Sequence, residues 1–230
     1  MDTGNDINIV EFCGLPFRWY EGMASPRRST ELLVNEVIKE LELNELDKEP
    51  TQIVDLCTGV GNIACALAKT LFNAHIIGID IDEKACMVAK SNADRLGFGD
   101  RITIIQHDIR DGILGGILPE FDLVIANPPY STTSKLNSLN GRDKILHREG
   151  RLAFDGGIDG LDVLRCVIEW AEYLLADYGF LAFEVNNAAS SKIEEELKHA
   201  KNLSSYKRIA IELDKLALIY IKGQLERHEI

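Results

Sequence analysis

Residues 127–130 (Asn-Pro-Pro-Tyr) follow directly after an apolar run and have the chemistry to orient a planar nitrogen group. Two consecutive prolines fix the backbone, so the side-chain oxygen of Asn127 and the main-chain carbonyl of Pro128 can converge on one small group. Two acceptors held in this way match an –NH2 group with its two N–H donors, and Tyr130 adds an aromatic face for stacking. The segment therefore predicts an amide or amine site; a proline turn that only ends a strand is the alternative interpretation.

A glycine-containing segment, 55–62 (DLCTGVGN), ends another apolar run and opens a helical pattern. Glycine lets a ligand approach backbone that a Cβ would block, and a helix N-terminus favours a carboxylate or phosphate. Taken alone, the spacing of Gly59, Gly61 and Ala64 also fits a dinucleotide fingerprint, so an NAD enzyme is one hypothesis. A tight turn without a ligand is another.

Carboxylates stand at the ends of three successive apolar runs: Asp55, Asp80 and Asp108. An acidic residue at the position of Asp80 can accept hydrogen bonds from ribose hydroxyls, and one at the position of Asp108 can meet the amine of an adenine. Each of these carboxylates alone could equally be a helix cap or a solvated loop residue, and for Asp82 a helix cap is the better interpretation. Together the three carboxylates are far more specific than any one of them, and they predict a nucleoside-binding edge.

The elements that position these residues begin at residue 51, where Ile, Val and Leu runs alternate with amphipathic stretches. Strands are expected at 51–56, 75–80, 102–108, 121–126 and 179–185, and helices at 61–72, 83–96, 161–176 and 188–200. This alternation is typical of an α/β fold with a doubly wound, mostly parallel sheet covered on both faces. The tail predicts two further strands, 206–212 and 215–222, joined around Leu213–Asp214.

The N-terminal part predicts a short hairpin, 7–13 with 16–20, and a helix from Arg27 to about residue 46. Its aromatic side chains are expected to pack over the core: Phe12, Phe17 and Trp19. Because no repeat or linker interrupts the chain, we expect one domain, 1–230, with the hairpin and helix in 1–50 and the core in 51–230.

Residues 127–157 show no clear periodicity and carry a charged cluster that includes Arg142. A segment of this length in a compact domain is uncommon and is usually functional. It leaves the sheet at the edge where α/β proteins bind ligands, so we interpret it as a substrate-binding segment. A solvated loop is the alternative.

The composition excludes several classes of function. With 25 basic and 37 acidic residues, the formal net charge is −12, which disfavours nucleic acid and anionic membranes as main partners. Five dispersed cysteines without a CxxC pair, and scattered histidines, predict neither a metal site nor a disulfide framework. The acidic N-terminus is unlike a signal peptide and no apolar run approaches the roughly 18 residues of a membrane helix. We therefore expect a cytoplasmic protein.

Several motifs together resemble one family. They are DLCTGVGNIA (55–64), GIDID (78–82), QHDIRDG (106–112), NPPY (127–130), LAFDGGIDGLDVLR (152–165) and SPRRSTELL (25–33). The chain resembles the class I S-adenosylmethionine-dependent methyltransferases, and more closely the HemK/PrmC type that methylates the side-chain amide of glutamine in translation release factors. The resemblance covers residues 9–185 in order.

The resemblance implies a seven-stranded sheet with an antiparallel last strand, and S-adenosyl-L-methionine as cofactor, with S-adenosyl-L-homocysteine as product. It displaces the NAD hypothesis, because a dehydrogenase fingerprint predicts nothing about NPPY. The implied cofactor-binding residues are Thr30, Asp55, Thr58, Gly59, Gly61, Asp80, Ile81, Asp108, Ile109 and Asn127. The implied catalytic residues are Asn127, Pro128 and Tyr130.

Several acceptors fit this chemistry. A glutamine amide in a protein such as a release factor is favoured, followed by a small-molecule amine, amide or heterocycle, and then an amino group in nucleic acid. The family's bacterial enzymes carry a helical N-terminal docking domain, whereas about 25 residues precede the first expected helix here. Three short segments also depart from the family pattern. Arg28-Ser29 stands where the family usually has Pro-Glu, Gly150 follows Glu149 where it usually has proline, and 212–215 (ELDK) stands where it has Gly-Arg-Asp-Arg. A cofactor-binding subunit without activity would not need NPPY. The sequence does not indicate an oligomeric state.

Overall fold

The computed structural model describes residues 7–44, 50–117, 119–139, 143–198, 203–212 and 215–222. Its main element is a seven-stranded sheet in the order β5-β4-β3-β6-β7-β9-β8. The strands are β3 (Gln52–Leu56), β4 (His75–Asp80), β5 (Ile102–Gln106), β6 (Phe121–Ala126), β7 (Leu175–Asn186), β8 (Leu203–Glu212) and β9 (Lys215–Lys222). β3 to β7 pair in parallel, and β9 runs antiparallel to β7 and β8. The predicted sheet, with its antiparallel last strand, is confirmed.

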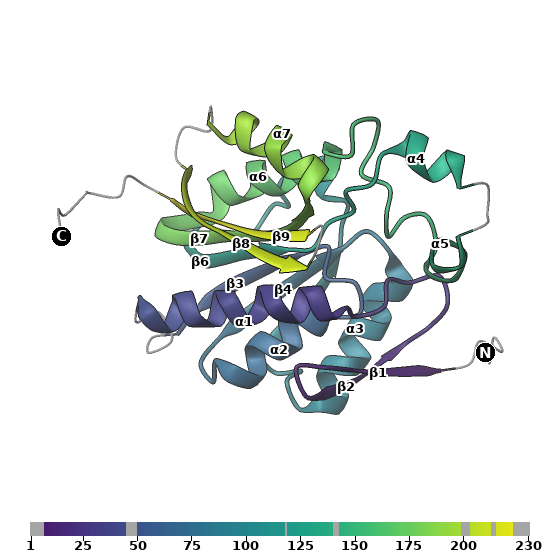
Figure 1. Ribbon diagram of the computed structural model, residues 1–230. Helices are drawn as coiled ribbons and strands as arrows, with labels where there is room; N and C mark the ends of the chain where they lie inside the picture. The colour runs from purple at the N-terminus through teal and green to yellow at the C-terminus, as the bar shows by residue number, and fades with distance from the viewer. Residues whose placement is uncertain are drawn as a thin grey trace.

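Helices cover both faces of this sheet, as Figure 1 shows. On one face lie α1 (Arg28–Leu43), α2 (Asn62–Thr70) and α3 (Glu83–Leu96), and on the other α6 (Asp162–Leu174) and α7 (Asn187–Leu197). Successive side chains of a strand point to opposite faces, so Ile53 of β3 packs in the core beside α1 and α2 whereas Val54 packs in the core beside α6. Burial on both faces explains why the strands are continuous apolar runs.

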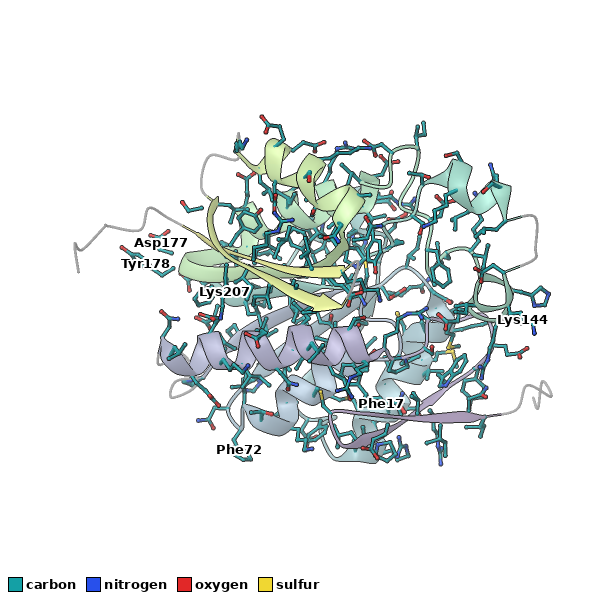
Figure 2. All side chains as sticks on the ribbon, in the orientation of Figure 1. Phe17, Phe72, Lys144, Asp177, Tyr178 and Lys207 are labelled. Atoms are coloured by element: carbon teal, nitrogen blue, oxygen red, sulfur yellow. The ribbon has the colours of Figure 1, made fainter. Side chains whose placement is uncertain are left out.

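The N-terminal hairpin is also confirmed. β1 (Asn8–Phe12) and β2 (Leu15–Trp19) pair antiparallel. Phe12 and Phe17 are fully buried and meet edge to face, with ring centroids 6.0 Å apart. Trp19 is buried as well, and Figure 2 shows Phe17 between the hairpin and the helices of this face. The hairpin therefore packs against the core, as expected from its aromatic residues.

The segment 127–157 contains regular structure that its sequence did not predict. Two short helices lie in it, α4 (Thr133–Ser138) and α5 (Lys144–Glu149). Each begins at a side-chain cap: Thr132 accepts from a main-chain N–H of α4, and Asp143 accepts from two in α5. The sequence shows no periodicity here because six residues span fewer than two helical turns. Residues 140–142, including Arg142, lie outside the described residues.

β7 begins earlier than expected. The strand starts at Leu175, directly after α6, rather than at residue 179. Its pairing with β6 shifts register between Phe121 and Leu123, and Tyr178 adopts a left-handed backbone with φ of 67°. This irregularity interrupts the apolar pattern, so the sequence does not indicate the first four residues of the strand. The predicted turn at Leu213–Asp214 lies outside the described residues.

Candidate active site

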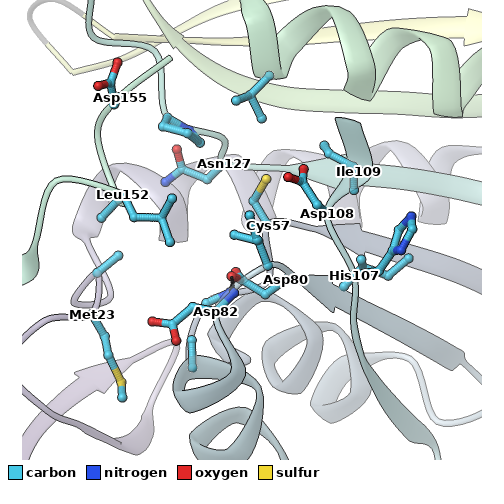
Figure 3. A pocket seen from close by; sticks show the side chains of 18 of the residues that line it. Met23, Cys57, Asp80, Asp82, His107, Asp108, Ile109, Asn127, Leu152 and Asp155 are labelled. Carbon is cyan, nitrogen blue, oxygen red and sulfur yellow. Dashed lines mark hydrogen bonds between the residues drawn. The ribbon is translucent and has the colours of Figure 1, made fainter. Parts of the chain in front are cut away.

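A cleft lies where the carboxyl ends of β3, β4, β5 and β6 meet. The chain runs from β3 outward to β4 on one side, while β6 pairs with the other side of β3, and ligands of α/β sheets bind at such a switch point. The cleft has two adjoining pockets. Both are lined by Ala24, Cys57, Gly59, Asn127, Pro129 and Ala153. Figure 3 shows Asn127, Cys57 and Asp80 in the first pocket, between Leu152 and Met23 on one side and Asp108 and Ile109 on the other.

Asp55 lies behind the wall of the cleft and holds the turn that follows β3. Its Oδ2 accepts from the Thr58 hydroxyl at 2.6 Å and from the Ala64 N–H at 3.2 Å. Its Oδ1 has no hydrogen-bond partner among the described residues, and burial raises the pKa of this carboxyl to about 7. Thr58 itself lines the second pocket. Asp55 thus shapes the turn from below rather than lining either pocket.

The two predicted glycines of this turn have different roles in the structure. Gly59 (φ of 56°) lines both pockets, and a Cβ there would meet no atom within 4 Å. Gly61 (φ of 79°) lies against α3, and a Cβ there would come within 3.1 Å of the Ala89 Cβ. The positive φ strains any residue with a Cβ at both positions, and at Gly61 the space is limited as well. Gly59 leaves the cleft open to a ligand, whereas Gly61 allows α2 to start close to α3.

Asp80 connects this turn to the end of β4. Its Oδ2 accepts from the Gly59 N–H at 2.8 Å, and its Oδ1 accepts from the Asp82 N–H at 2.9 Å. Burial raises the pKa of Asp80. Asp82 caps α3 through the Lys84 N–H, as predicted. Asp80 and Ile81 both line the first pocket.

The end of β5 forms the far wall of the first pocket. Asp108 and Ile109 line it. The guanidinium of Arg110 lies 2.7 Å from an oxygen of Asp108 and holds the pKa of that carboxyl below its usual range. Trp170 of α6 donates from Nε1 to the Ile109 carbonyl at 3.0 Å and fixes this wall from behind. Sequence reasoning missed Trp170, since only the packing of α6 brings it here.

Asn127 stands at the boundary between the two pockets and is held from the side of α1. Its Nδ2 donates to the Thr30 hydroxyl at 2.8 Å, and Thr30 donates to Glu184 Oε2 at 3.1 Å. The Tyr130 hydroxyl donates a hydrogen bond to Glu184 Oε1 at 2.9 Å. With Pro128, these residues line the second pocket. Glu184 was missed from the sequence, although a charged residue inside the apolar run FLAFEVN is an available signal.

The segment before α1 and the helix α5 close the outer side of the cleft. Buried Glu149 accepts from the Ser25 hydroxyl at 2.7 Å and from the Arg27 guanidinium at 2.5 Å. The Gly22 N–H donates to the Arg148 carbonyl at 2.7 Å. Because residues on both sides of this contact line the pockets, α5 and residues 22–27 together form the roof of the site.

Comparison with known proteins identifies the class. Residues 47–208 match the family described as methyltransferase domain, and the chain belongs to this family. The release factor glutamine methyltransferase of Moorella thermoacetica is 35% identical over 185 residues, 80% of this chain and 62% of that protein. The ribosomal protein uL3 glutamine methyltransferase of Francisella tularensis is 33% identical over 184 residues, 80% of this chain and 56% of that protein. The chain thus spans less than two thirds of the length of these relatives.

Solved structures show the same fold. The magnesium protoporphyrin IX methyltransferase of Synechocystis, solved with bound SAM, matches with a TM-score of 0.58 at 17% identity, over 85% of this chain and 80% of that chain. At this identity the likeness defines the fold alone. Within the part of the chain that the structure describes, no helix is long and apolar enough to cross a membrane.

Proposed function

We propose that this protein transfers a methyl group from S-adenosyl-L-methionine to the side-chain amide nitrogen of a protein glutamine, with a release factor as the first candidate substrate. The observation that carries the proposal is Asn127, which stands between two adjoining pockets with its carboxamide nitrogen bound to Thr30. The names of the two relatives above, both glutamine methyltransferases, support the same acceptor.

The first pocket suits the cofactor. Gly59 opens its floor where a Cβ would project into free space, and the carboxylates of Asp80 and Asp108 line its walls as acceptors for hydroxyl and amine groups. We propose that the Gly59 turn holds the methionine part, with Thr58 contributing from the second pocket and Asp55 supporting the turn from behind. Asp80 and Ile81 would hold the ribose, with Asp108 and Ile109 beside the adenine. Gly61 would contribute to cofactor binding by letting α2 pack close to α3, and Thr30 by holding Asn127.

Methyl transfer needs the acceptor nitrogen, the methyl carbon and the sulfur to be aligned, and it needs no covalent enzyme intermediate. S-adenosyl-L-methionine supplies a methyl group on a positively charged sulfur. The Asn127 side-chain oxygen and the Pro128 carbonyl would accept the two N–H bonds of the acceptor amide, which orients the nitrogen toward the first pocket. As the bond from sulfur to the methyl carbon breaks and the bond to nitrogen forms, positive charge would develop on that nitrogen, where the same two oxygens stabilise it. The nitrogen would then release one proton to solvent, which leaves the N-methylated amide and S-adenosyl-L-homocysteine. Tyr130 would stack against the planar amide. We expect no histidine to act as an essential base.

The remaining proposals concern the setting of the reaction. A protein substrate agrees with the acidic chain, whose net charge of −12 disfavours nucleic acid. We propose a cytoplasmic protein whose core, 51–230, performs the reaction and whose residues 1–50 complete the roof of the site. Residues 127–157 would then contact the substrate.

Transfer of labelled methyl from S-adenosyl-L-methionine into a host-cell lysate tests the proposal. The lysate is fractionated into protein, nucleic acid and small molecules after incubation with the purified protein. We expect label in one protein band that maps to a glutamine. Label confined to the small-molecule fraction would overturn the protein substrate and would indicate an N-methyltransferase of metabolites.

A further inference from the structure

A chain of hydrogen bonds runs from the candidate acceptor site into the core. It leads from Asn127 Nδ2 to the Thr30 hydroxyl, over 2.8 Å, and from that hydroxyl to Glu184 Oε2, over 3.1 Å. Glu184 is 0% exposed and Thr30 is 2% exposed. Asn127 follows β6, Thr30 lies in α1 and Glu184 lies in β7. The hydrogen bonds therefore join three elements at the boundary of the two pockets.

Four donors surround the Glu184 carboxyl group. Its Oε1 accepts from the Tyr130 phenol at 2.9 Å and from the Ser29 hydroxyl at 3.2 Å, and Lys215 Nζ lies 3.2 Å from the same oxygen. The Thr30 hydroxyl occupies Oε2. An ammonium group beside a buried carboxylate offsets the unfavourable burial of its charge. With donors on both oxygens, Glu184 acts in this network as an acceptor alone.

This acceptor sets the direction of every bond in the chain. A hydroxyl carries one proton, and Thr30 gives its proton to Glu184. The Thr30 oxygen can therefore only accept from Asn127, and the carboxamide must turn its –NH2 toward Thr30. The Asn127 oxygen is then the carboxamide atom that does not contact Thr30, in a residue that lines both pockets. A flipped carboxamide would present N–H groups to the N–H groups of the acceptor, and the two would repel.

We infer that Glu184 is a positioning residue that fixes the orientation of the Asn127 carboxamide through Thr30. The inference deepens the proposed function, since it assigns how the acceptor nitrogen is recognised. It also gives Thr30 a role at the acceptor rather than in direct cofactor contact. Two positions at which the sequence departs from the resembled family also meet at this network. Lys215 Nζ donates to Ser29 Oγ at 2.9 Å.

Glu184→Gln tests the donor and acceptor order of these hydrogen bonds, because glutamine has almost the same shape as glutamate. The glutamine Nε2 can donate to Thr30, which frees the Thr30 proton for the Asn127 oxygen and lets the carboxamide flip. We expect kcat on a purified release factor to fall about a hundredfold, the loss typical when one preorganised partner of the transition state is removed. The dissociation constant for S-adenosyl-L-homocysteine should stay within about twofold of wild type. A kcat within about threefold of wild type would overturn the inference.

Two further variants separate this role from a general effect on folding. Thr30→Val removes the hydroxyl without touching a charge and should reproduce the loss of kcat, whereas Thr30→Ser should restore it. The double variant Glu184→Gln with Thr30→Val should lose no more than either single variant, because both act through Asn127. Additive losses would contradict a shared route. Glu40→Gln is the matched control. Glu40 lies in the last turns of α1 and is also buried beside a lysine, Lys207, which Figure 2 labels, and the kcat of this variant should be unchanged.

A spectroscopic readout does not depend on the acceptor. In the wild-type protein, the Asn127 side-chain N–H protons should show NMR cross-relaxation with the Thr30 methyl group, with the signal assigned by its loss in Asn127→Asp. Glu184→Gln should remove this contact. If the wild type labels no release factor, the proposed substrate fails while this experiment still decides the inference. A contact that persists unchanged in Glu184→Gln would overturn it.

Discussion

The stability of this protein should depend on pH through the buried carboxyl of Asp55. That side chain is fully buried, its Oδ1 has no hydrogen-bond partner among the described residues, and burial raises its pKa from 3.8 to about 7. The folded state therefore binds this proton more tightly than the unfolded chain. The contribution of the neutral carboxyl is fully present below about pH 4 and is lost as the pH rises to about 7.

The size of the effect follows from the two pKa values. One pKa unit corresponds to about 1.4 kcal/mol. Between pH 5 and pH 8, the wild type should lose about 3 kcal/mol in free energy of unfolding through Asp55. Asp55→Asn has no proton to lose. The amide changes the hydrogen bonds to Thr58 and Ala64, but by the same amount at every pH, so the comparison between two pH values isolates the charge.

Urea denaturation of both proteins, followed by tryptophan fluorescence across this pH range, measures the effect. Relative to the wild type, Asp55→Asn should gain about 3 kcal/mol between pH 5 and pH 8. Titrating groups that do not interact with Asp55 are common to both proteins and cancel in the difference. A difference that stays constant with pH would show that Asp55 ionises near its ordinary value and would refute the reasoning.

Two further predictions concern the cleft. Asn127→Ala should lower methyl transfer at least about a hundredfold because it removes one of the two acceptors for the reacting nitrogen, while calorimetric titration finds the cofactor affinity within about twofold; unchanged turnover would contradict the role. Asp80→Ala should weaken cofactor binding at least about tenfold, because its carboxylate also holds the Gly59 and Asp82 N–H groups; an unaltered dissociation constant in the same titration would count against the assignment.

The fold was predictable where local patterns decide it. The runs 75–80 and 121–126 match β4 and β6, because apolar runs bounded by turn residues mark strand ends. The range 83–96 matches α3, with the cap at Asp82 and Gly97 in the left-handed conformation at its end. The first residues of β7, 175–178, were not predictable, because the irregular pairing with β6 is a property of two strands and not of one.

The candidate site was predictable only in its outline. Asp80, Asp108 and Asn127 could be foreseen at one edge, since parallel strands bring their carboxyl ends together. The contacts of Glu184 could not, because Ser29 and Thr30 lie more than 150 residues away in the sequence. Such partners are set by how α1 packs against β7, and no local pattern of residues encodes that packing.

Mass spectrometry of a purified release factor, after incubation with this protein and S-adenosyl-L-methionine, tests the proposed reaction most directly. We predict that one glutamine gains the mass of a single CH2 group and that fragmentation assigns the gain to its side-chain amide. Asn127→Ala should lower the yield at least about a hundredfold. A release factor that gains no methyl group on any glutamine, while label from the same cofactor enters another fraction of the lysate, would contradict the proposed substrate.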